Sequence, residues 1–266
     1  MMLPSMNLDL TLGCGQVFRW FRDGEWWSGV IDGQEVYLRA DERGIEVRGE
    51  LSRDRLREYF RAGDDLEIIY AEIAKDSLMR DLTSRFRGLR LIRQDPWECS
   101  LSYLLATNAN VPRIQKMVDT VCRTFGPRLP GGRYAFPTPS NILDKEEQTL
   151  KCGLGYRCGR MVEFAHRVEE GHLDFEALVG MSYTECISYL KGFEGIGDKV
   201  ADCIALFSLD HLEAFPVDVR IRRVMDSVYG ITGSYRAVRE RGQEYFGRYA
   251  GYAQELLYHW DGLRGT

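Results

Sequence analysis

The sequence predicts an α+β protein, with an N-terminal antiparallel β-sheet domain followed by a two-lobed, mostly α-helical region. Apolar and polar residues alternate through the first fifty residues, and Asp23-Gly24 and Asp32-Gly33 have the composition of tight hairpin turns. After Ser52 the apolar residues recur at helical spacing, and helical patterns dominate to the end of the chain. The order of elements is therefore a sheet first and helices after it.

The expected strands are short and follow one another as a meander over residues 16–20, 25–31, 35–40 and 44–48. Ser52 is a suitable cap for the first helix after them, and Asp95-Pro96 and Pro112 have the composition of two later helix starts. Further helices are expected near residues 145–151, 158–169, 184–191, 199–208, 217–229 and 252–260. The composition changes near residue 94, which predicts a sheet domain with flanking helices over residues 1–94 and a helical catalytic region over residues 95–266.

The composition excludes several classes of protein. No apolar run is long enough to span a bilayer, and the N-terminus lacks the pattern of a signal peptide, so we expect an intracellular protein of the cytoplasm and nucleoid, or of the nucleus in a eukaryote. The seven cysteines are scattered without metal-site spacing and are expected to be free thiols. A net charge of −5 excludes nucleic-acid binding by bulk positive charge, so any DNA contact must be local. The most basic stretch, residues 85–93, fits a solvated loop edge and a phosphate contact equally well.

The most informative stretch is a glycine-rich turn between two expected helices, at about residues 184–208. Gly195 and Gly197 can take positive φ angles and can present bare backbone amides to a phosphate, towards which the next helix also points its N-terminus. Phe193 and Ile196 would anchor the turn in the core. From the glycines alone, a tight structural corner is the favoured interpretation.

Two patterns around this turn resemble those of DNA repair proteins. The hydrophobic–x–Gly–hydrophobic–Gly–x–x–x–Ala pattern that ends at Ala201 resembles the helix-hairpin-helix motif. Some nineteen residues after Lys199, the segment Phe215–Arg220 resembles the Pro-Val-Asp ending of the helix-hairpin-helix glycosylase superfamily. The two patterns together, at this spacing, predict a base-excision glycosylase.

The resemblance makes Lys199 and Asp218 the expected catalytic pair. Release of a damaged base requires a nucleophile at C1′ and stabilisation of an oxocarbenium-like sugar. An amine supplies the first by forming a Schiff base, which leads on to β-elimination of the 3′ phosphate. Burial at the N-terminus of a helix favours the neutral form that an amine needs for attack. The carboxylate of Asp218 supplies the second by its charge.

Seven segments, spread over nearly the whole chain, resemble landmarks of the 8-oxoguanine DNA glycosylase family. They are GQVFRW at 15–20, RLIRQDP at 90–96, TNANVPRI at 107–114, GPRL at 126–129, LGYR at 154–157, KVADC at 199–203 and YAGYAQ at 249–254. No cysteine follows Cys203, so the iron–sulfur cluster of the endonuclease-III-like branch is not expected.

This resemblance implies a role for each matching position. The carbonyl of Gly15 would accept a hydrogen bond from N7–H, which 8-oxoguanine has and guanine lacks. With guanine, the carbonyl oxygen would face the bare N7, so two acceptors would oppose each other. Gln254 would read the Watson–Crick edge of the flipped base. The faces and sides of the base would be covered by Tyr258, Cys203, Phe207 and Pro216. Tyr258 departs from the phenylalanine also seen at this position but keeps an aromatic face.

The resemblance also implies the contacts with DNA outside the base pocket. Asn108 would fill the space left by the flipped base, Tyr156 would wedge beside it, and Arg113 and Arg157 would donate to the orphaned cytosine. Arg220 stands where relatives often have a histidine near a phosphate. Backbone carbonyls of the turn would hold a monovalent cation when DNA is bound, and no other cofactor is expected; they belong to Lys191, Phe193 and Ile196.

We therefore expect a bifunctional DNA glycosylase and AP lyase that acts as a monomer on duplex DNA containing 8-oxoguanine opposite cytosine. A monofunctional alkylpurine glycosylase is one alternative, and Lys199 together with the Gly15 segment disfavours it. The other alternative is a non-catalytic helix-hairpin-helix protein that uses the turn only to bind phosphate. Such a protein would not need Lys199 and Asp218 together.

Overall fold

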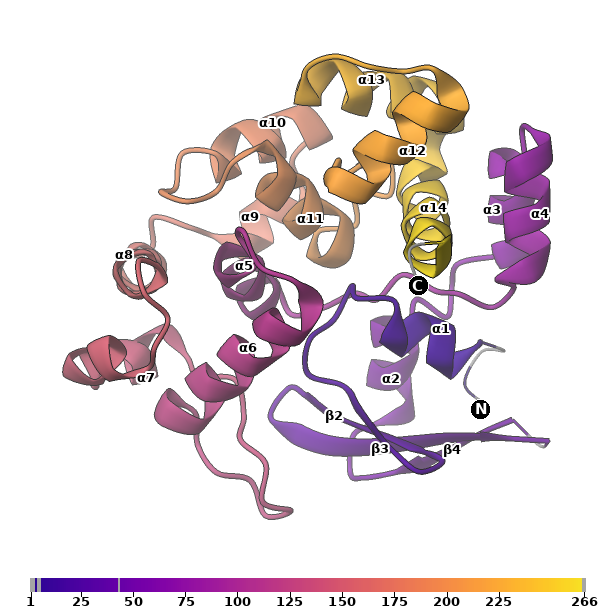
Figure 1. The fold of residues 1–266 in the computed structure, drawn as a ribbon. Helices are drawn as coiled ribbons and strands as arrows, with labels where there is room; N and C mark the ends of the chain where they lie inside the picture. The colour runs from indigo at the N-terminus through magenta and orange to yellow at the C-terminus, as the bar shows by residue number, and fades with distance from the viewer. Residues whose placement is uncertain (1–2, 4–5, 43, 265–266) are drawn as a thin grey trace.

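The computed structural model describes residues 3, 6–42 and 44–264, and it confirms a sheet followed by many helices (Figure 1). Four antiparallel strands pair in chain order: β1 (Phe21–Asp23), β2 (Trp26–Ile31), β3 (Gln34–Asp41) and β4 (Gly44–Arg48). Asp32-Gly33 forms the turn between β2 and β3, as predicted, with the positive φ angles of a primed turn. The first turn is displaced by one residue from the prediction: Asp23 ends β1, and Gly24-Glu25 forms the turn.

The predicted strand at residues 16–20 is wrong, because this segment hydrogen bonds to side chains and loops instead of to a sheet. The buried side-chain amide of Gln16 donates to the carbonyls of Thr11 (2.9 Å) and Arg90 (2.8 Å), and its oxygen accepts from the amide of Ile92 (2.8 Å). The carbonyl of Gln16 accepts from Tyr103 Oη at 3.1 Å. The first strand begins only at Phe21, beyond these bonds.

Most predicted helices are present, with ends within a few residues of those expected. Ser52 and Asp95 cap their helices as predicted, each accepting a hydrogen bond from a backbone amide. Residues 146–151 form a 3₁₀-helix, and the helix over residues 235–246 was not predicted. The helices are α1 (Leu8–Gly13), α2 (Arg53–Tyr59), α3 (Leu66–Ile73), α4 (Ser77–Arg85), α5 (Pro96–Leu105), α6 (Val111–Phe125), α7 (Pro139–Leu143), η1 (Glu146–Lys151), α8 (Arg157–Glu169), α9 (Phe175–Val179), α10 (Tyr183–Leu190), α11 (Asp198–Ser208), α12 (Val219–Tyr229), α13 (Tyr235–Phe246), η2 (Gly247–Tyr249) and α14 (Ala250–Arg264).

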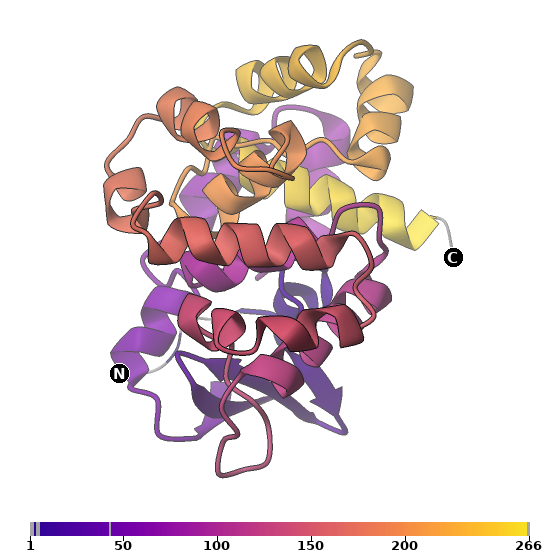
Figure 2. The same ribbon diagram turned by 90° about the vertical axis from the view of Figure 1, so that its left-hand side faces the viewer.

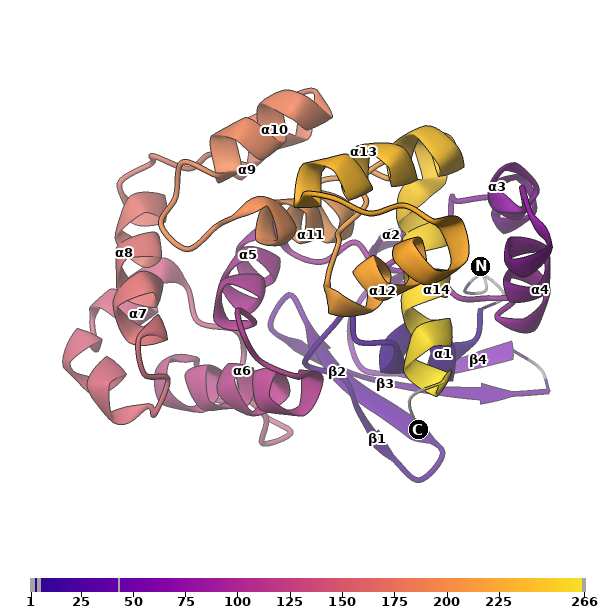
Figure 3. The ribbon, with the colours of Figure 1, turned by 45° about the horizontal axis from the view of Figure 1, so that its top comes forward.

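The apolar side chains form two clusters. The smaller one packs the sheet against α1 and α2, and the larger one joins the helices from α3 onward, with Phe18 added from the N-terminal segment. Helix α8 lies across one side of the molecule, with the sheet below it and the orange and yellow C-terminal helices above it (Figure 2). Helix α14 runs beside α12 and also packs on α13, α3 and α4 (Figure 3). The domain boundary near residue 94 stays a prediction.

Two expectations about the whole chain can be compared with the structure. All seven cysteines are free, as predicted, and six of them are buried. Within the ranges that the structure describes, no helix has both the length and the apolar character that crossing a membrane requires.

Candidate active site

A single cleft of about 560 Å³ brings together residues from both ends of the chain. Its walls come from the loop after α1, the start of α6, and helices α11, α12 and α14, with the side of α5 behind them. All the predicted catalytic and base-contacting residues line this cleft, and so does Arg220; they are Gly15, Lys199, Cys203, Phe207, Pro216, Asp218, Gln254 and Tyr258. The volume falls within the range of small-molecule sites in proteins.

Lys199 lies in the first turn of α11 and is half-buried. Its Nζ is 5.0 Å from the ring centroid of Tyr103, and this ring stacks on Phe207 at 5.7 Å with an interplanar angle of 8°. Cys203 lies one helical turn beyond the lysine, and burial raises the pKa of its thiol to about 12, an effect that the nearby Lys199 side chain partly offsets. The cleft therefore offers an amine against an aromatic wall and a neutral sulfur.

Asp218 is fixed at the N-terminus of α12. Its Oδ1 accepts a hydrogen bond from the backbone amide of Ile221 at 2.8 Å, which caps the helix and places the carboxylate at its positive end. The preceding residue is held as well, because the amide of Val217 donates to Tyr235 Oη at 3.2 Å. The cleft thus receives a negative charge from a rigid part of the backbone.

Gly15 forms a wall of the cleft with its backbone. Its φ of +102° belongs to a region that favours glycine, and a Cβ would lie 3.3 Å from Val111 Cγ2 and 3.7 Å from Tyr258 Cε1. Gln254, on α14, is buried, and its side-chain oxygen has no hydrogen-bond partner in the described part of the chain. A buried carbonyl oxygen without a partner is expected where a ligand supplies the donor.

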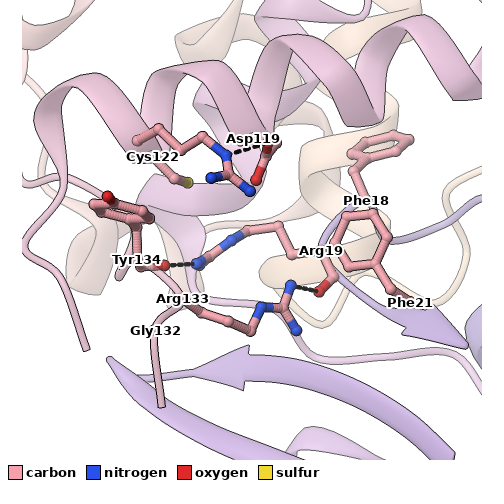
Figure 4. Close-up of a pocket in the computed structure, with 9 residues that line it drawn as sticks. Phe18, Arg19, Phe21, Asp119, Cys122, Gly132, Arg133 and Tyr134 are labelled. Atoms are coloured by element: carbon pink, nitrogen blue, oxygen red, sulfur yellow. Dashed lines mark hydrogen bonds and ion pairs between the residues drawn. The ribbon is translucent and has the colours of Figure 1, made fainter. Parts of the chain in front are cut away.

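The segment that carries Gly15 is anchored by Arg19 (Figure 4). This buried guanidinium donates to Glu98 Oε2 at 2.9 Å and to the carbonyl of Tyr134. The side chain of Arg133 donates in turn to the carbonyl of Arg19 at 3.0 Å. These bonds tie the Gly15–Trp20 segment to α5 and to the loop between α6 and α7, so the backbone wall of the cleft is held from behind.

Of the predicted opposite-base residues, Asn108 lies on the loop between α5 and α6, Arg113 follows it on α6, and Tyr156 and Arg157 contact this segment from the start of α8. Asn108 is exposed, with a left-handed φ of +55°. Arg113 is exposed on α6, whereas Arg157 is buried and donates to the carbonyls of Leu105 (2.8 Å) and Thr107. In the structure Arg157 therefore braces the loop that presents Asn108. The exposed Tyr156 ring lies beneath the guanidinium of Arg157, and its hydroxyl donates to the carbonyl of Thr107 at 3.2 Å.

The glycine-rich turn joins α10 to α11, with Phe193 and Ile196 buried as predicted. Gly195 has the expected positive φ, +87°, and a Cβ would lie 2.9 Å from side-chain carbons of both Arg160 and Leu104. Gly197 differs from the expectation, since its φ is −92°. It caps α11 without any side chain, and nothing lies within 4 Å of the place where its Cβ would be, so the amides of the helix start are open to a ligand.

The turn also contains the carbonyls predicted to hold a monovalent cation. The carbonyl of Phe193 already accepts the amide of Ile196 at 3.1 Å, and the Lys191 side chain pairs with Asp198 at 2.5 Å. Across residues 3, 6–42 and 44–264, no three histidine, cysteine or acidic side chains are grouped as metal ligands. A cation in the turn would therefore be held by backbone oxygens, and this stays a proposal.

Comparison with known proteins decides the family. Residues 3–99 match the family model described as the N-terminal domain of 8-oxoguanine DNA glycosylase. The N-glycosylase/DNA lyase OGG1 of Arabidopsis thaliana is 31% identical, in an alignment covering 95% of this chain and 76% of the relative. The chain belongs to the 8-oxoguanine DNA glycosylase family.

Solved structures agree with this membership of the 8-oxoguanine DNA glycosylase family. A Clostridium acetobutylicum 8-oxoguanine glycosylase/lyase, in complex with double-stranded DNA containing cytosine opposite 8-oxoG, superposes with a TM-score of 0.92 at 30% identity. That superposition covers 98% of this chain and 93% of the other. The 3-methyladenine DNA glycosylase of Archaeoglobus fulgidus shares the fold, with a TM-score of 0.81 at 23% identity over 99% and 98% of the two chains.

Several cleft residues of this family member were not predicted from the sequence, and two of them carry polar groups that bear on the chemistry. Tyr103 and Glu255 both line the cleft, on α5 and α14. The signal for Glu255 was present in the sequence, because it is an acidic residue in the mostly apolar run AGYAQELL at 250–257, and the structure buries every residue of that run. Tyr103 gave no signal, since an aromatic residue in an apolar helix usually belongs to the core.

Proposed function

We propose that this protein excises 8-oxoguanine from opposite cytosine in duplex DNA and then cleaves the strand as an AP lyase. One observation carries the proposal: Lys199, Asp218, Gly15 and Gln254, which are up to 239 residues apart, line the same cleft. A phosphate-binding turn alone would not require an amine, a carboxylate and a base-sized pocket together. Membership of the family supports both activities.

In the proposed reaction, the neutral amine of Lys199 forms a bond to C1′ as the bond between C1′ and N9 of the base breaks. Asp218 stabilises the positive charge that develops on the sugar. The departing base takes up the proton that the attached nitrogen releases, and opening of the sugar ring, with a proton added to O4′, then leaves an iminium link between the lysine and C1′. Loss of a proton from C2′ breaks the bond between C3′ and its phosphate oxygen, which cuts the strand on the 3′ side.

Base recognition would use the backbone of Gly15 and the amide of Gln254. The Gly15 carbonyl accepts N7–H from 8-oxoguanine, while guanine sets its bare N7 against the same oxygen. The unpartnered oxygen of Gln254 accepts from the Watson–Crick edge. Tyr258 and Cys203 cover the two faces, and Phe207 and Pro216 close the sides of the pocket.

Outside the pocket, Asn108 would occupy the space left in the duplex, with Tyr156 beside it and Arg113 and Arg157 on the orphaned cytosine. The amides that follow Gly197 and the guanidinium of Arg220, which lies 4.7 Å over the Tyr258 ring, are suited to two phosphates. The turn carbonyls of Lys191, Phe193 and Ile196 would gain a monovalent cation in the DNA complex. One chain supplies every wall of the cleft, so we propose a monomer, acting inside the cell in the nucleoid or nucleus.

Borohydride trapping tests the catalytic proposal. Wild-type protein incubated with an 8-oxoguanine·cytosine duplex should give a covalent protein–DNA adduct after reduction, and Lys199→Ala should give none. Asp218→Asn should still bind the duplex but form the adduct much more slowly. Wild-type protein that binds this duplex and traps nothing would contradict the lyase mechanism.

Base release from two duplexes tests the substrate. Release from 8-oxoguanine DNA, with little or none from alkylated DNA, is the expected result. The opposite preference would favour an alkylpurine glycosylase with the same fold.

A further inference from the structure

The carboxyl of Glu255 is buried in the cleft without a full set of partners. Its side chain lines the cleft and is 2% exposed, and Oε1 has no hydrogen-bond partner among the residues that the structure describes. A buried oxygen without a partner costs free energy, and such groups cluster where a ligand completes them. The chemistry proposed above assigns this residue no role.

Its position points to one side of the pocket. The carboxyl lies near the side chain of Cys14, the residue directly before Gly15, whose thiol donates to the carbonyl of Thr11. It therefore lies beside the backbone that is proposed to face N7 of the flipped base. Five further titratable or charged groups face it from the surrounding helices: Tyr103 on α5, Lys199 on α11, Asp218 and Arg220 on α12, and Tyr258 on α14.

These surroundings favour a proton on the carboxyl. Burial, with a smaller contribution from Asp218, raises the pKa of Glu255 to about 7, against the lowering effects of Cys14, Arg220 and Lys199. The neutral acid can donate a hydrogen bond, whereas the carboxylate can only accept. Both forms are therefore accessible near neutral pH.

We propose that Glu255 is a further base-contacting residue, whose neutral carboxyl donates a hydrogen bond to a carbonyl oxygen of the flipped base beside Gly15. This inference rests on the proposed function. 8-Oxoguanine carries a carbonyl oxygen on each side of N7, so its edge reads acceptor, donor, acceptor. The Gly15 carbonyl meets the central donor, and an adjacent O–H group meets one of the flanking acceptors.

A dependence on pH follows from this contact. Once Glu255 loses its proton, the carboxylate faces a carbonyl oxygen, and an acceptor opposite an acceptor weakens binding of the base. Affinity for the lesion should fall as the pH rises through the pKa of Glu255. A glutamine at this position has the same shape and keeps an N–H donor at every pH.

The test measures binding of an 8-oxoguanine duplex whose 2′-fluoro sugar prevents cleavage. A duplex with a tetrahydrofuran abasic site serves as reference, because it has the same backbone and no base. Wild-type protein should bind the lesion duplex about 5- to 10-fold more weakly at about pH 8.5 than at about pH 6, relative to the reference. Glu255→Gln should remove this dependence, and Glu255→Ala should bind weakly at both pH values. Identical pH profiles for wild type and Glu255→Gln would overturn the assignment.

A second variant keeps the test decisive if Glu255→Gln does not fold. Cys14→Ala removes a partner that lowers the pKa of Glu255, so it should move the midpoint of the pH dependence upward. An unmoved midpoint would also count against Glu255. Failure of the proposed function would look different, since the wild type would then bind the lesion duplex no better than a guanine duplex at any pH.

Discussion

The hydroxyl of Tyr235 donates a hydrogen bond to Asp202, with 2.5 Å between Oη and Oδ2. The same hydroxyl accepts the amide of Val217 at 3.2 Å, so one side chain from α13 connects two parts of the cleft. Asp202 lies on α11, three residues after the proposed nucleophile, and Val217 directly precedes Asp218. Tyr235 therefore positions the lysine helix and the carboxylate relative to each other, without itself touching the cleft.

Replacing Tyr235 by phenylalanine should slow base release as well as destabilise the fold. The change leaves Val217 without a partner and Asp202 with one hydrogen bond fewer, at a cost of roughly 1–3 kcal/mol in the free energy of unfolding. A small displacement of Asp218 should lower the single-turnover excision rate about tenfold or more. Urea unfolding and single-turnover kinetics measure the two effects separately.

Tyr183→Phe is the matched control for this prediction. The hydroxyl of Tyr183 donates to Asp202 Oδ1 and, unlike the hydroxyl of Tyr235, makes no hydrogen bond with Val217. It should cost a similar free energy of unfolding and leave the excision rate nearly unchanged. Equal rate losses in the two variants would show that the effect comes from Asp202 alone.

Glu255→Gln should change how stability depends on pH. The pKa of Glu255 is about 7 in the folded protein and 4.5 ordinarily, so its stabilising contribution is complete below about pH 4.5 and is lost as the pH rises to about 7. The difference is worth roughly 3 kcal/mol. The free energy of unfolding of the glutamine variant should therefore increase relative to wild type across this interval. Urea titrations at several pH values provide the measurement.

Glu213→Gln supplies a control of opposite sign. His211 holds the pKa of Glu213 below its ordinary value by a hydrogen bond and by its charge, against the effect of burial. Glu213 therefore stabilises the fold above the ordinary pKa, and this contribution is lost at low pH. Its replacement should make the protein relatively less stable as the pH rises, the reverse of the change expected for Glu255→Gln.

The two glycines of the turn should respond differently to substitution. Gly195→Ala places a Cβ in a left-handed residue and against two side chains, so it should cost about 1–2 kcal/mol of stability. Gly197→Ser should leave stability unchanged or slightly higher, because serine is a good helix cap. The new hydroxyl would occupy an amide offered to phosphate, so duplex affinity should fall. Unchanged affinity for Gly197→Ser would contradict phosphate binding at the start of α11.

The two arginines assigned to the orphaned cytosine can be separated by stability. Arg157→Ala removes buried hydrogen bonds to Leu105 and Thr107 and should cost about 1–3 kcal/mol, whereas the exposed Arg113→Ala should cost little. Both should relax the preference for cytosine opposite the lesion. Excision rates with each of the four opposing bases measure this preference, and a preference unchanged in both variants would contradict the assignment.

Local signals predicted much of the fold. Helices that begin with a cap and a proline, such as the one after Asp95, were predicted correctly because the cap chemistry is contained in a few neighbouring residues. The segment from Gln16 to Trp20 was misassigned because its alternating pattern serves buried hydrogen bonds to residues more than seventy positions away. Helix α13 was missed because its sequence is dominated by charged residues with few apolar positions.

The residues of the candidate site were predicted through motifs, but the contacts that hold those residues in place were not. Lys199 and Asp218 are recognisable by their spacing, and Gly15 and Gln254 by resemblance. Tyr235 and Arg157 act through backbone groups of other segments, and no sequence pattern encodes such a contact. Tyr103 is both a core residue and part of the wall of the cleft. Sequence periodicity detects only its place in the core.

The arrangement of the cleft walls has a consequence for the protein while it is being synthesised on the ribosome. Gly15 forms one wall of the base pocket and Tyr258 lies close to it. These two residues are farther apart in the sequence than any other pair among the proposed site residues. Contacts of this kind form late, because the intervening chain must be ordered first. A ribosome-bound chain that lacks α14 would already carry Lys199 and the phosphate-binding turn. It should nevertheless be unable to select a base until α14 has been made and has packed against the segment that carries Gly15.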